Sequence, residues 1–159
     1  MITYAAYGSN MNRQQMLART GGETEAVAIG TALLRDWQLE FRRGVLTIIP
    51  QFGGTVPLAL WRIGAQARHA LDHYEGAPWL YAPLLFQGAS LVPTGGDVPD
   101  EFLIYVMTAD GVNTIDRVDA PGATYYETCK QGYADFGLQE WQWVLEAARE
   151  RALKEVHHG

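Results

Sequence analysis

The segment Ile2–Asn12, with the sequence ITYAAYGSNMN, constrains the fold of this chain more than any other stretch. Its first part, Ile2–Tyr7, is rich in β-branched and aromatic residues and predicts a short strand. A polar Gly-Ser-Asn triplet at positions 8–10 interrupts that strand, and a helix is expected over Arg13–Arg19. A strand, a tight loop and a helix start in this order direct backbone N–H groups toward one point. We therefore expect an anion or oxyanion site at this loop, strengthened by the positive end of the helix dipole.

Length, composition and charge limit the class of protein. A chain of 159 residues suits one domain with its own core, and 17 glycines with seven prolines favour several short strands over a helix bundle. A net charge of −6, with no basic cluster longer than Arg42-Arg43, argues against nucleic acid and against a membrane as partner. Neither a membrane span nor a secretory leader is expected from the sequence. Cys129 is the single cysteine, so we expect a reducing compartment and a cytoplasmic location.

Hydrophobic patterns predict the order of elements. Strands are expected over 26–34, 37–41, 46–49, 56–63, 81–92 and 102–107, and further helices over 65–74, 124–133 and 139–153. Turns are expected at 35–36 and 51–55 and a loop at 109–121, and Pro57 suggests an edge strand or a bulge. The last helix is expected to bury Trp143 and Leu145. This mixed order predicts an α+β fold, a single domain over 1–156 with a mixed, highly curved sheet or small β-barrel and flanking helices, followed by a frayed tail at 157–159.

Several residue types that often carry chemistry have ordinary interpretations here. Ser9 is a candidate nucleophile, but AYGSN lacks the GxSxG elbow and no histidine has a matching place, so we interpret Ser9 as a turn residue. His69 and His73 have a spacing that can place two metal ligands side by side on a helix. No HExxH motif or further Cys/His cluster accompanies them, so no metal site is predicted. Cys129 is expected to be a small buried apolar residue.

Glu75 has an unusual place for a carboxylate. It is expected at the C-terminal end of the helix over 65–74, where the helix dipole disfavours negative charge. Its sequence neighbours from Leu71 to Tyr81 are mostly apolar or aromatic. Both effects raise a carboxyl pKa above its usual ~4.3 and toward neutral pH, where the group can exchange protons in catalysis. The alternative is an ordinary exposed loop glutamate, and the residues alone leave both interpretations open.

Four motifs, in order along the chain, resemble the γ-glutamylcyclotransferase family. AYGSNMNRQQMLAR is similar to the aromatic-Ala-Tyr-Gly-Ser-Asn signature near the start of that family. RRGVLTIIP at 42–50 resembles its Arg-Gly-Val-Ala-Thr-Ile-x-Pro strand, and LDHYEGAP at 71–78 resembles the segment that carries its catalytic glutamate. PGATYYETCKQGYADFGL at 121–138 is similar to its Pro-Ser-x-x-Tyr helix. The four motifs together span nearly the whole chain.

The resemblance implies a reaction and a set of site residues. In this family the α-amine of a γ-glutamyl group attacks its own γ-carbonyl, which gives 5-oxoproline and releases an amine or amino acid without a cofactor or metal. The matching position makes Glu75 the catalytic general acid/base. The matching pocket residues, which would bind the substrate, are Tyr7, Gly8, Ser9, Asn10, Tyr81 and Tyr125.

The expected partner is therefore a small γ-glutamyl molecule, and a homodimer is left open. A hypothesis from a different class is a binding or regulatory module that holds a glutamyl ligand without turnover. Retention of Glu75 favours the enzyme, because glutamyl binding alone has no evident use for an acid/base. Leu58 and Leu46 depart from the glycine and alanine usual in the family, and either side chain is expected to narrow the pocket or change the leaving group.

Overall fold

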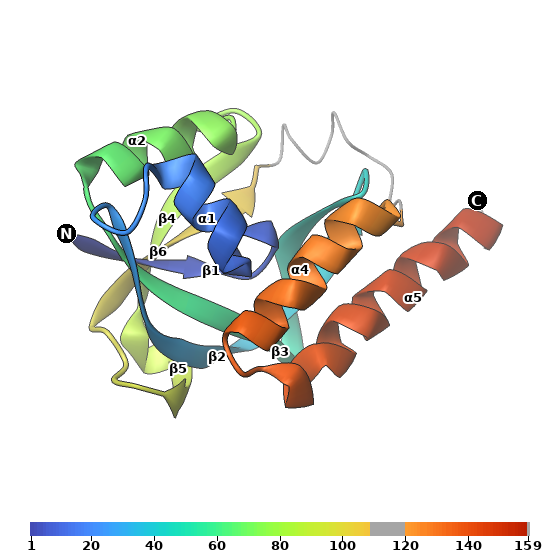
Figure 1. Ribbon diagram of the computed structural model, residues 1–159. Helices are drawn as coiled ribbons and strands as arrows, with labels where there is room; N and C mark the ends of the chain where they lie inside the picture. Colours follow the sequence, from blue (N-terminus) through green and yellow to red (C-terminus); the bar gives the residue numbers. More distant parts are fainter. Residues whose placement is uncertain (109–119, 159) are drawn as a thin grey trace.

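A mixed six-stranded sheet with the order β4-β6-β1-β3-β2-β5 organises the computed structural model, which describes residues 1–108 and 120–158 (Figure 1). The strands are β1 (Ile2–Ala6), β2 (Ala26–Arg42), β3 (Val45–Ile63), β4 (Tyr81–Gln87), β5 (Leu91–Gly95) and β6 (Glu101–Met107). The four α-helices of the described residues are α1 (Arg13–Thr20), α2 (Ala65–Tyr74), α4 (Ala123–Asp135) and α5 (Gln142–His158). Three short 3-10 turns are η1 (Ser9–Met11), η2 (Gly88–Ser90) and η3 (Gln139–Trp141). The expected single-domain α+β fold is confirmed.

The sheet is strongly curved but not closed into a barrel. Its outermost strands, β4 and β5, are joined only through the three residues of η2. A connection of that length spans at most ~14 Å, whereas the outer strands of a flat six-stranded sheet lie ~24 Å apart. The two edges therefore have to approach one another. The prediction of one strand over 81–92 is wrong. That segment forms β4 and the start of β5, which lie at opposite edges of the sheet and are separated by η2.

The strands β2 and β3 form one long hairpin, for which the sequence predicts four shorter strands. Its turn consists of Arg43 and Gly44, which both have positive φ, as a two-residue type I′ turn requires. The expected turn at 35–36 is instead a bulge, in which Asp36 has φ +64° and its carboxylate accepts the Gly53 N–H at 3.0 Å. The expected turn at 51–55 is the opposite side of the same bulge. The residues that favour turns do not end either strand here, because β2 and β3 continue to pair on both sides of the bulge.

Pro57 stands in β3, a central strand, yet its place is a local edge. Pairing of β3 with β1 extends only from Ala59 to Ile63, so at Pro57 the strand has β2 as its neighbour but no longer β1. A proline N atom cannot donate to a ladder, and this position tolerates that loss.

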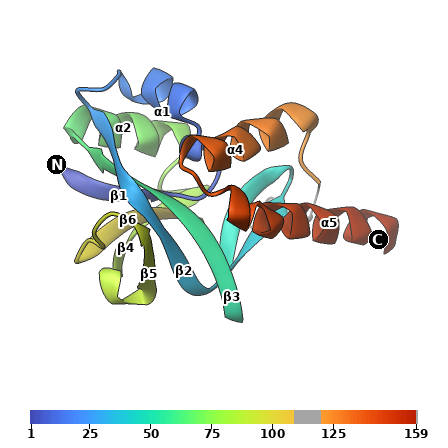
Figure 2. The same cartoon turned by 60° about the horizontal axis from the view of Figure 1, so that its bottom comes forward.

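The helices lie in two pairs around the sheet. Figures 1 and 2 show α1 beside α2, and α4 and α5 together near the far half of the β2–β3 hairpin. In α5, Leu145 is buried as expected, but Trp143 is 57% exposed because the inward face follows Val144 and Ala148. The expected frayed tail at 157–158 is helical, and residue 159 lies outside the described residues. None of the helices in the described part of the chain is long and apolar enough to cross a membrane.

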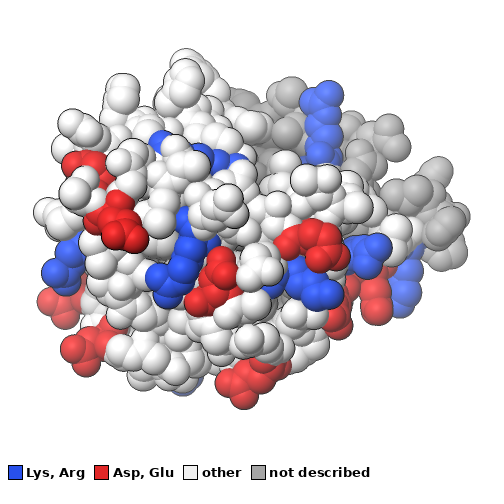
Figure 3. Space-filling model, in the orientation of Figure 1, with Lys and Arg blue, Asp and Glu red and all other residues white. Residues whose placement is uncertain are grey.

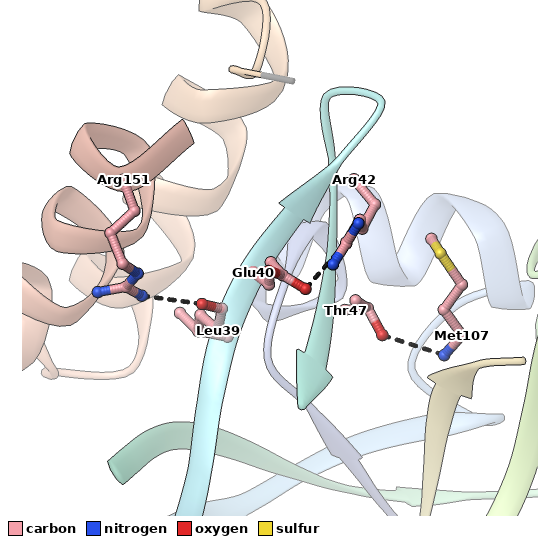
Figure 4. A network of polar contacts seen from close by, with 6 residues as sticks. All are labelled: Leu39, Glu40, Arg42, Thr47, Met107 and Arg151. Atoms are coloured by element: carbon pink, nitrogen blue, oxygen red, sulfur yellow. Dashed lines mark hydrogen bonds and ion pairs between the residues drawn. The ribbon is translucent and has the colours of Figure 1, made fainter. Parts of the chain in front are cut away.

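Polar contacts fix the far half of the hairpin in place (Figure 4). Arg151 of α5 donates to the Leu39 carbonyl at 2.9 Å. On the other side, the Met107 N–H donates to Thr47 Oγ1 at 3.0 Å, which ties β3 to the end of β6. The far half of the hairpin also lies close to the end of β1, since a Cβ at Gly8 would be 3.7 Å from Leu46 Cβ.

Candidate functional site

A cavity of about 240 Å³ opens where β1 ends and η1 begins. Residues from β1, η1, the β2–β3 hairpin, the end of α2, β4, β6 and α4 surround it. The lining residues are Tyr4, Tyr7, Gly8, Ser9, Asn10, Val45, Leu46, Tyr74, Glu75, Leu80, Tyr81, Tyr105 and Tyr125. Every site residue expected from the sequence is in this set, so residues more than one hundred positions apart come together here.

The loop after β1 is the 3-10 turn η1. The Met11 N–H donates to the Gly8 carbonyl at 3.1 Å, and the Asn12 N–H donates to the Ser9 carbonyl at 3.0 Å. The N–H groups of Ser9 and Asn10 precede these bonds and take no part in them, as at the start of any helical turn. Gly132 lets α4 pack directly on η1, since a Cβ there would lie 2.6 Å from Met11 Cβ.

The start of α1 contributes less to the site than expected. Its Gln15 N–H donates to the side chain of the N-cap residue Asn12 at 3.0 Å, and its Arg13 N–H donates to Asp135 at 3.0 Å. None of these residues lines the cavity. The prediction that this helix end faces the site is wrong, because other protein groups already occupy its donors; η1 faces the cavity instead.

Asn10 is 4% exposed in the cavity wall and hydrogen-bonds to residues of several elements. Its Nδ2 donates to the Tyr4 hydroxyl at 3.0 Å and lies 3.5 Å from Glu75 Oε1. Its carbonyl oxygen accepts from Trp61 Nε1 at 3.1 Å, and its Oδ1 accepts a short bond from Arg19. Backbone and side chain are thus both fixed from several elements.

The tyrosines expected at the site also shape its wall. The Tyr81 hydroxyl donates to the Leu46 carbonyl at 2.7 Å, and the Leu46 N–H donates to the Tyr125 hydroxyl at 3.1 Å. The Tyr7 hydroxyl donates to the Tyr105 carbonyl at 2.5 Å. These bonds hold β3, β4, β6 and α4 around one space. Burial raises the pKa of Tyr7, Tyr81 and Tyr125, so their hydroxyls stay protonated near neutral pH.

Glu75 is the C-cap residue of α2, as expected, and its side chain is partly buried in the cavity wall. Burial raises the pKa of Glu75 to about 7, and the Arg19 guanidinium offsets part of that rise. The direction agrees with the expectation from sequence, but the expected surroundings are partly wrong. Trp79 is 77% exposed and Pro78 is exposed as well, so tyrosines from distant elements enclose the carboxyl in their place.

The other candidate residues have simpler environments. Ser9 Oγ accepts a hydrogen bond from Arg19 at 3.0 Å. Cys129 is fully buried as expected, and burial raises the pKa of its thiol to about 12, which makes it a poor nucleophile. His69 and His73 are exposed on α2, and the described residues contain no group of three metal-ligating side chains. Figure 3 shows acidic and basic side chains interspersed on one face, so this face presents no large area of a single charge.

The two departures from the family pattern have different places. Leu46 lines the cavity, as expected for a residue that narrows the pocket. Leu58 is fully buried in the hydrophobic core and does not line the cavity. The expectation that Leu58 narrows the pocket is therefore wrong, since its side chain points into the core of the sheet.

Sequence reasoning missed three important residues. Tyr4 and Tyr105 line the cavity, and Arg19 contacts its wall. Consecutive residues of β1 and β6 are buried, so the local pattern assigns neither tyrosine to one face and does not distinguish a cavity from the core. A basic residue in the last turn of a helix is already favoured by the helix dipole, so Arg19 gave no separate signal.

Comparisons with known proteins agree on family and fold. The chain matches the family described as "Gamma-glutamyl cyclotransferase, AIG2-like" over residues 4–127, which include every residue that lines the cavity. No curated protein matches the chain. A solved structure described as "Gamma-glutamyl cyclotransferase" is 20% identical, with a TM-score of 0.74 and 99% of each chain covered.

Two further solved structures are similar. An uncharacterized protein from Homo sapiens is 22% identical, with a TM-score of 0.73, over 92% of this chain and 86% of that one. YkqA from Bacillus subtilis is 21% identical, with a TM-score of 0.71, over 95% of this chain but only 54% of its own. At these identities the likeness shows a shared fold.

Proposed function

Because the chain belongs to the γ-glutamyl cyclotransferase, AIG2-like family, we propose that it converts a γ-glutamyl compound into 5-oxoproline and an amine or amino acid. The observation that carries this proposal is Glu75, a carboxyl with a pKa of about 7 in a cavity wall beside Asn10. A general acid/base is most effective when its pKa lies near the working pH. The acid/base therefore stands next to the turn that would hold the glutamyl group.

The proposed reaction is intramolecular. Glu75 takes a proton from the attacking α-nitrogen of the substrate, and this nitrogen forms a bond to the γ-carbonyl carbon. Glu75 then gives a proton to the leaving nitrogen as its bond to the same carbon breaks. No water or external nucleophile is consumed. Holding the glutamyl chain folded supplies much of the rate, because nucleophile and carbonyl belong to one molecule.

The η1 turn is the proposed donor to the oxyanion that forms during attack. The N–H groups of Ser9 and Asn10 are left out of the turn's own bonds, and both residues line the cavity. Preorganised backbone donors of this kind stabilise a tetrahedral intermediate without further rearrangement. The cavity of about 240 Å³ suits a small molecule, since it lies just below the ~300 Å³ at which drug-sized pockets begin.

The test is a panel of γ-glutamyl amino acids and γ-glutamyl amines, with 5-oxoproline measured by mass spectrometry. We expect product from at least one substrate and almost none from Glu75→Gln, which keeps the shape but cannot exchange protons. Glu150→Gln is the matched control, because Glu150 is exposed on α5 and outside the cavity.

Two outcomes would contradict the proposal. Tight binding of glutamyl ligands without product from any substrate would favour the binding or regulatory module. Product formed by Glu75→Gln at the rate of the parent protein would remove Glu75 from the acid/base role.

A further inference from the structure

We propose that Arg19 is a positioning residue for the proposed reaction, which holds the η1 turn against the end of α2 so that Asn10 faces Glu75. This inference rests on the proposed function. It concerns a residue outside the cavity lining that contacts both sides of the site.

The first side is the η1 turn. Arg19 Nη1 donates to Ser9 Oγ at 3.0 Å and makes a short bond to Asn10 Oδ1. A guanidinium can only donate hydrogen bonds, so the atom of Asn10 that faces it has to be the amide oxygen. The Asn10 Nδ2 group is consequently directed at Tyr4 and Glu75. Arg19 therefore decides which end of the Asn10 amide meets the carboxyl.

The second side is the end of α2. Arg19 Nη2 donates to the Tyr74 hydroxyl at 2.5 Å, and the guanidinium carbon lies 3.5 Å from the centre of the Tyr74 ring. Tyr74 directly precedes Glu75 in the chain. One planar group thus joins the turn to the residue next to the acid/base. A lysine ammonium lacks the planar fork and cannot reproduce these contacts together.

Arg19 also acts on Glu75 through its charge. The titratable side chains that face Glu75 from the surrounding elements are Tyr4, Tyr7, Arg19, Tyr74, Tyr81, Tyr105 and Tyr125. Among these described residues Arg19 is the single cation. Its attraction for the carboxylate keeps the pKa of Glu75 below the value that burial alone would give. Orientation and charge can therefore be separated by substitution.

The experiment compares Arg19→Met, which removes fork and charge, with Arg19→Lys, which keeps only the charge. For Arg19→Met we expect a loss of kcat of about 10- to 100-fold and an acid limb of the pH profile that moves to higher pH. For Arg19→Lys we expect a loss of about tenfold, with the acid limb near its original pH. Arg62→Met, which removes the same charge from an exposed position on β3, is the matched control and should leave both unchanged.

A second readout needs no activity. Carbon-13 NMR of the labelled Glu75 carboxyl gives its pKa in the free protein, and Arg19→Met should raise that pKa. An unchanged pKa in Arg19→Met, or parental kcat in Arg19→Lys, would overturn the positioning role. If Arg19→Met does not fold, Arg19→Lys and Tyr74→Phe still test the hydrogen bonds that the guanidinium makes to the two sides of the site. Absence of 5-oxoproline in the parent protein would count against the proposed function alone, since the NMR titration still shows whether Arg19 acts on Glu75.

Discussion

Two carboxyl groups stand three residues apart at the end of α2, and the fold gives them opposite surroundings. Asp72 accepts two bonds from Arg68 Nε, at 3.1 and 3.3 Å, and one from the Tyr105 hydroxyl at 2.5 Å, and its side chain is 37% exposed. Glu75 lies in the cavity wall, and among the described side chains its hydrogen-bond partner is Asn10, at 3.5 Å. One carboxylate is paired and in contact with water, while the other is poorly solvated.

The comparison teaches that the partners a fold supplies, and not helix position, set the behaviour of a carboxyl. Asp72 and Glu75 both lie near the same helix C-terminus and share the same dipole. Asp72 binds Tyr105 of β6, whereas Glu75 lies in the cavity wall with the buried tyrosines of β1, β4 and α4, and burial raises its pKa to about 7. A well-paired carboxylate is suited to holding structure, and a poorly solvated one is suited to moving protons.

The largest expected effect is the loss of activity when the Glu75 carboxyl is neutralised, compared with the same change at Asp72. Glu75→Gln should lower kcat/KM for 5-oxoproline formation by about 10³-fold, within the range for loss of a general acid/base. Asp72→Asn should lower it by no more than about tenfold, since Asp72 does not line the cavity. Steady-state kinetics on the best substrate of the panel measures both. Equal losses in the two variants would end the distinction between the carboxyls.

The pH dependence of kcat/KM should show the same contrast. Glu75 has to be ionised to accept the proton, so activity falls as the pH drops through its pKa of about 7. The expected fall is about tenfold per pH unit below that value, or about 100-fold at pH 5. Asp72→Asn should leave this limb in place. A limb that stays flat down to pH 5 would contradict the assignment of Glu75.

Stability should also depend on pH through Glu75. Its folded pKa of about 7 exceeds the ordinary value of 4.5, so between these pH values the unfolded chain releases a proton that the folded chain retains. Folded stability therefore decreases as the pH rises through this window, by about 1 to 3 kcal/mol for a partly buried group. Glu75→Gln should gain that amount over the parent protein at pH 8 relative to pH 4. Urea unfolding at the two pH values measures the difference; Asp72→Asn, as the control, should show no such gain.

The smallest effect is expected at the paired carboxyl itself. Tyr105→Phe removes the hydroxyl that donates to Asp72 but keeps the ring that packs against Tyr4, with 5.8 Å between ring centres. Because Arg68 still binds Asp72, the free energy of unfolding should fall by about 1 kcal/mol. The acid limb of the activity profile should not move. A shift of that limb would mean that Asp72 and Glu75 act as one unit.

Much of the fold could be predicted from local patterns, and the errors share one cause. Helix α2 begins and ends at the expected residues, and α1 begins at the expected Arg13 and ends one residue beyond Arg19. The expected turns at 35–36 and 51–55 are two sides of one bulge, and 81–92 forms two strands. Whether a glycine or an aspartate ends a strand depends on the partner strand, which a local window does not contain.

Some residues of the candidate site could be predicted from sequence motifs, and others were found only from the structure. The family motifs identified Glu75, the Tyr7–Asn10 loop, Tyr81 and Tyr125, and all of them line one cavity. Arg19 is the last residue of the first motif, but the resemblance gave it no role, and Tyr4 precedes that motif; both were found only from their contacts with Asn10. Leu58 was expected at the pocket, but its side chain lies in the core. Motifs identify positions, whereas side-chain direction follows from packing.

By itself, the sequence determined the α+β class and the turn that follows β1, and its family motifs pointed to Glu75 as the proposed acid/base. Glycine, proline and capping residues act over a few positions, so a linear pattern is enough to place them. Only the tertiary structure decided that the sheet curves without closing, that η1 and not α1 faces the cavity, and that Arg19 joins the two sides of the site. These features depend on desolvation and on contacts between distant elements, and neither exists before the chain folds.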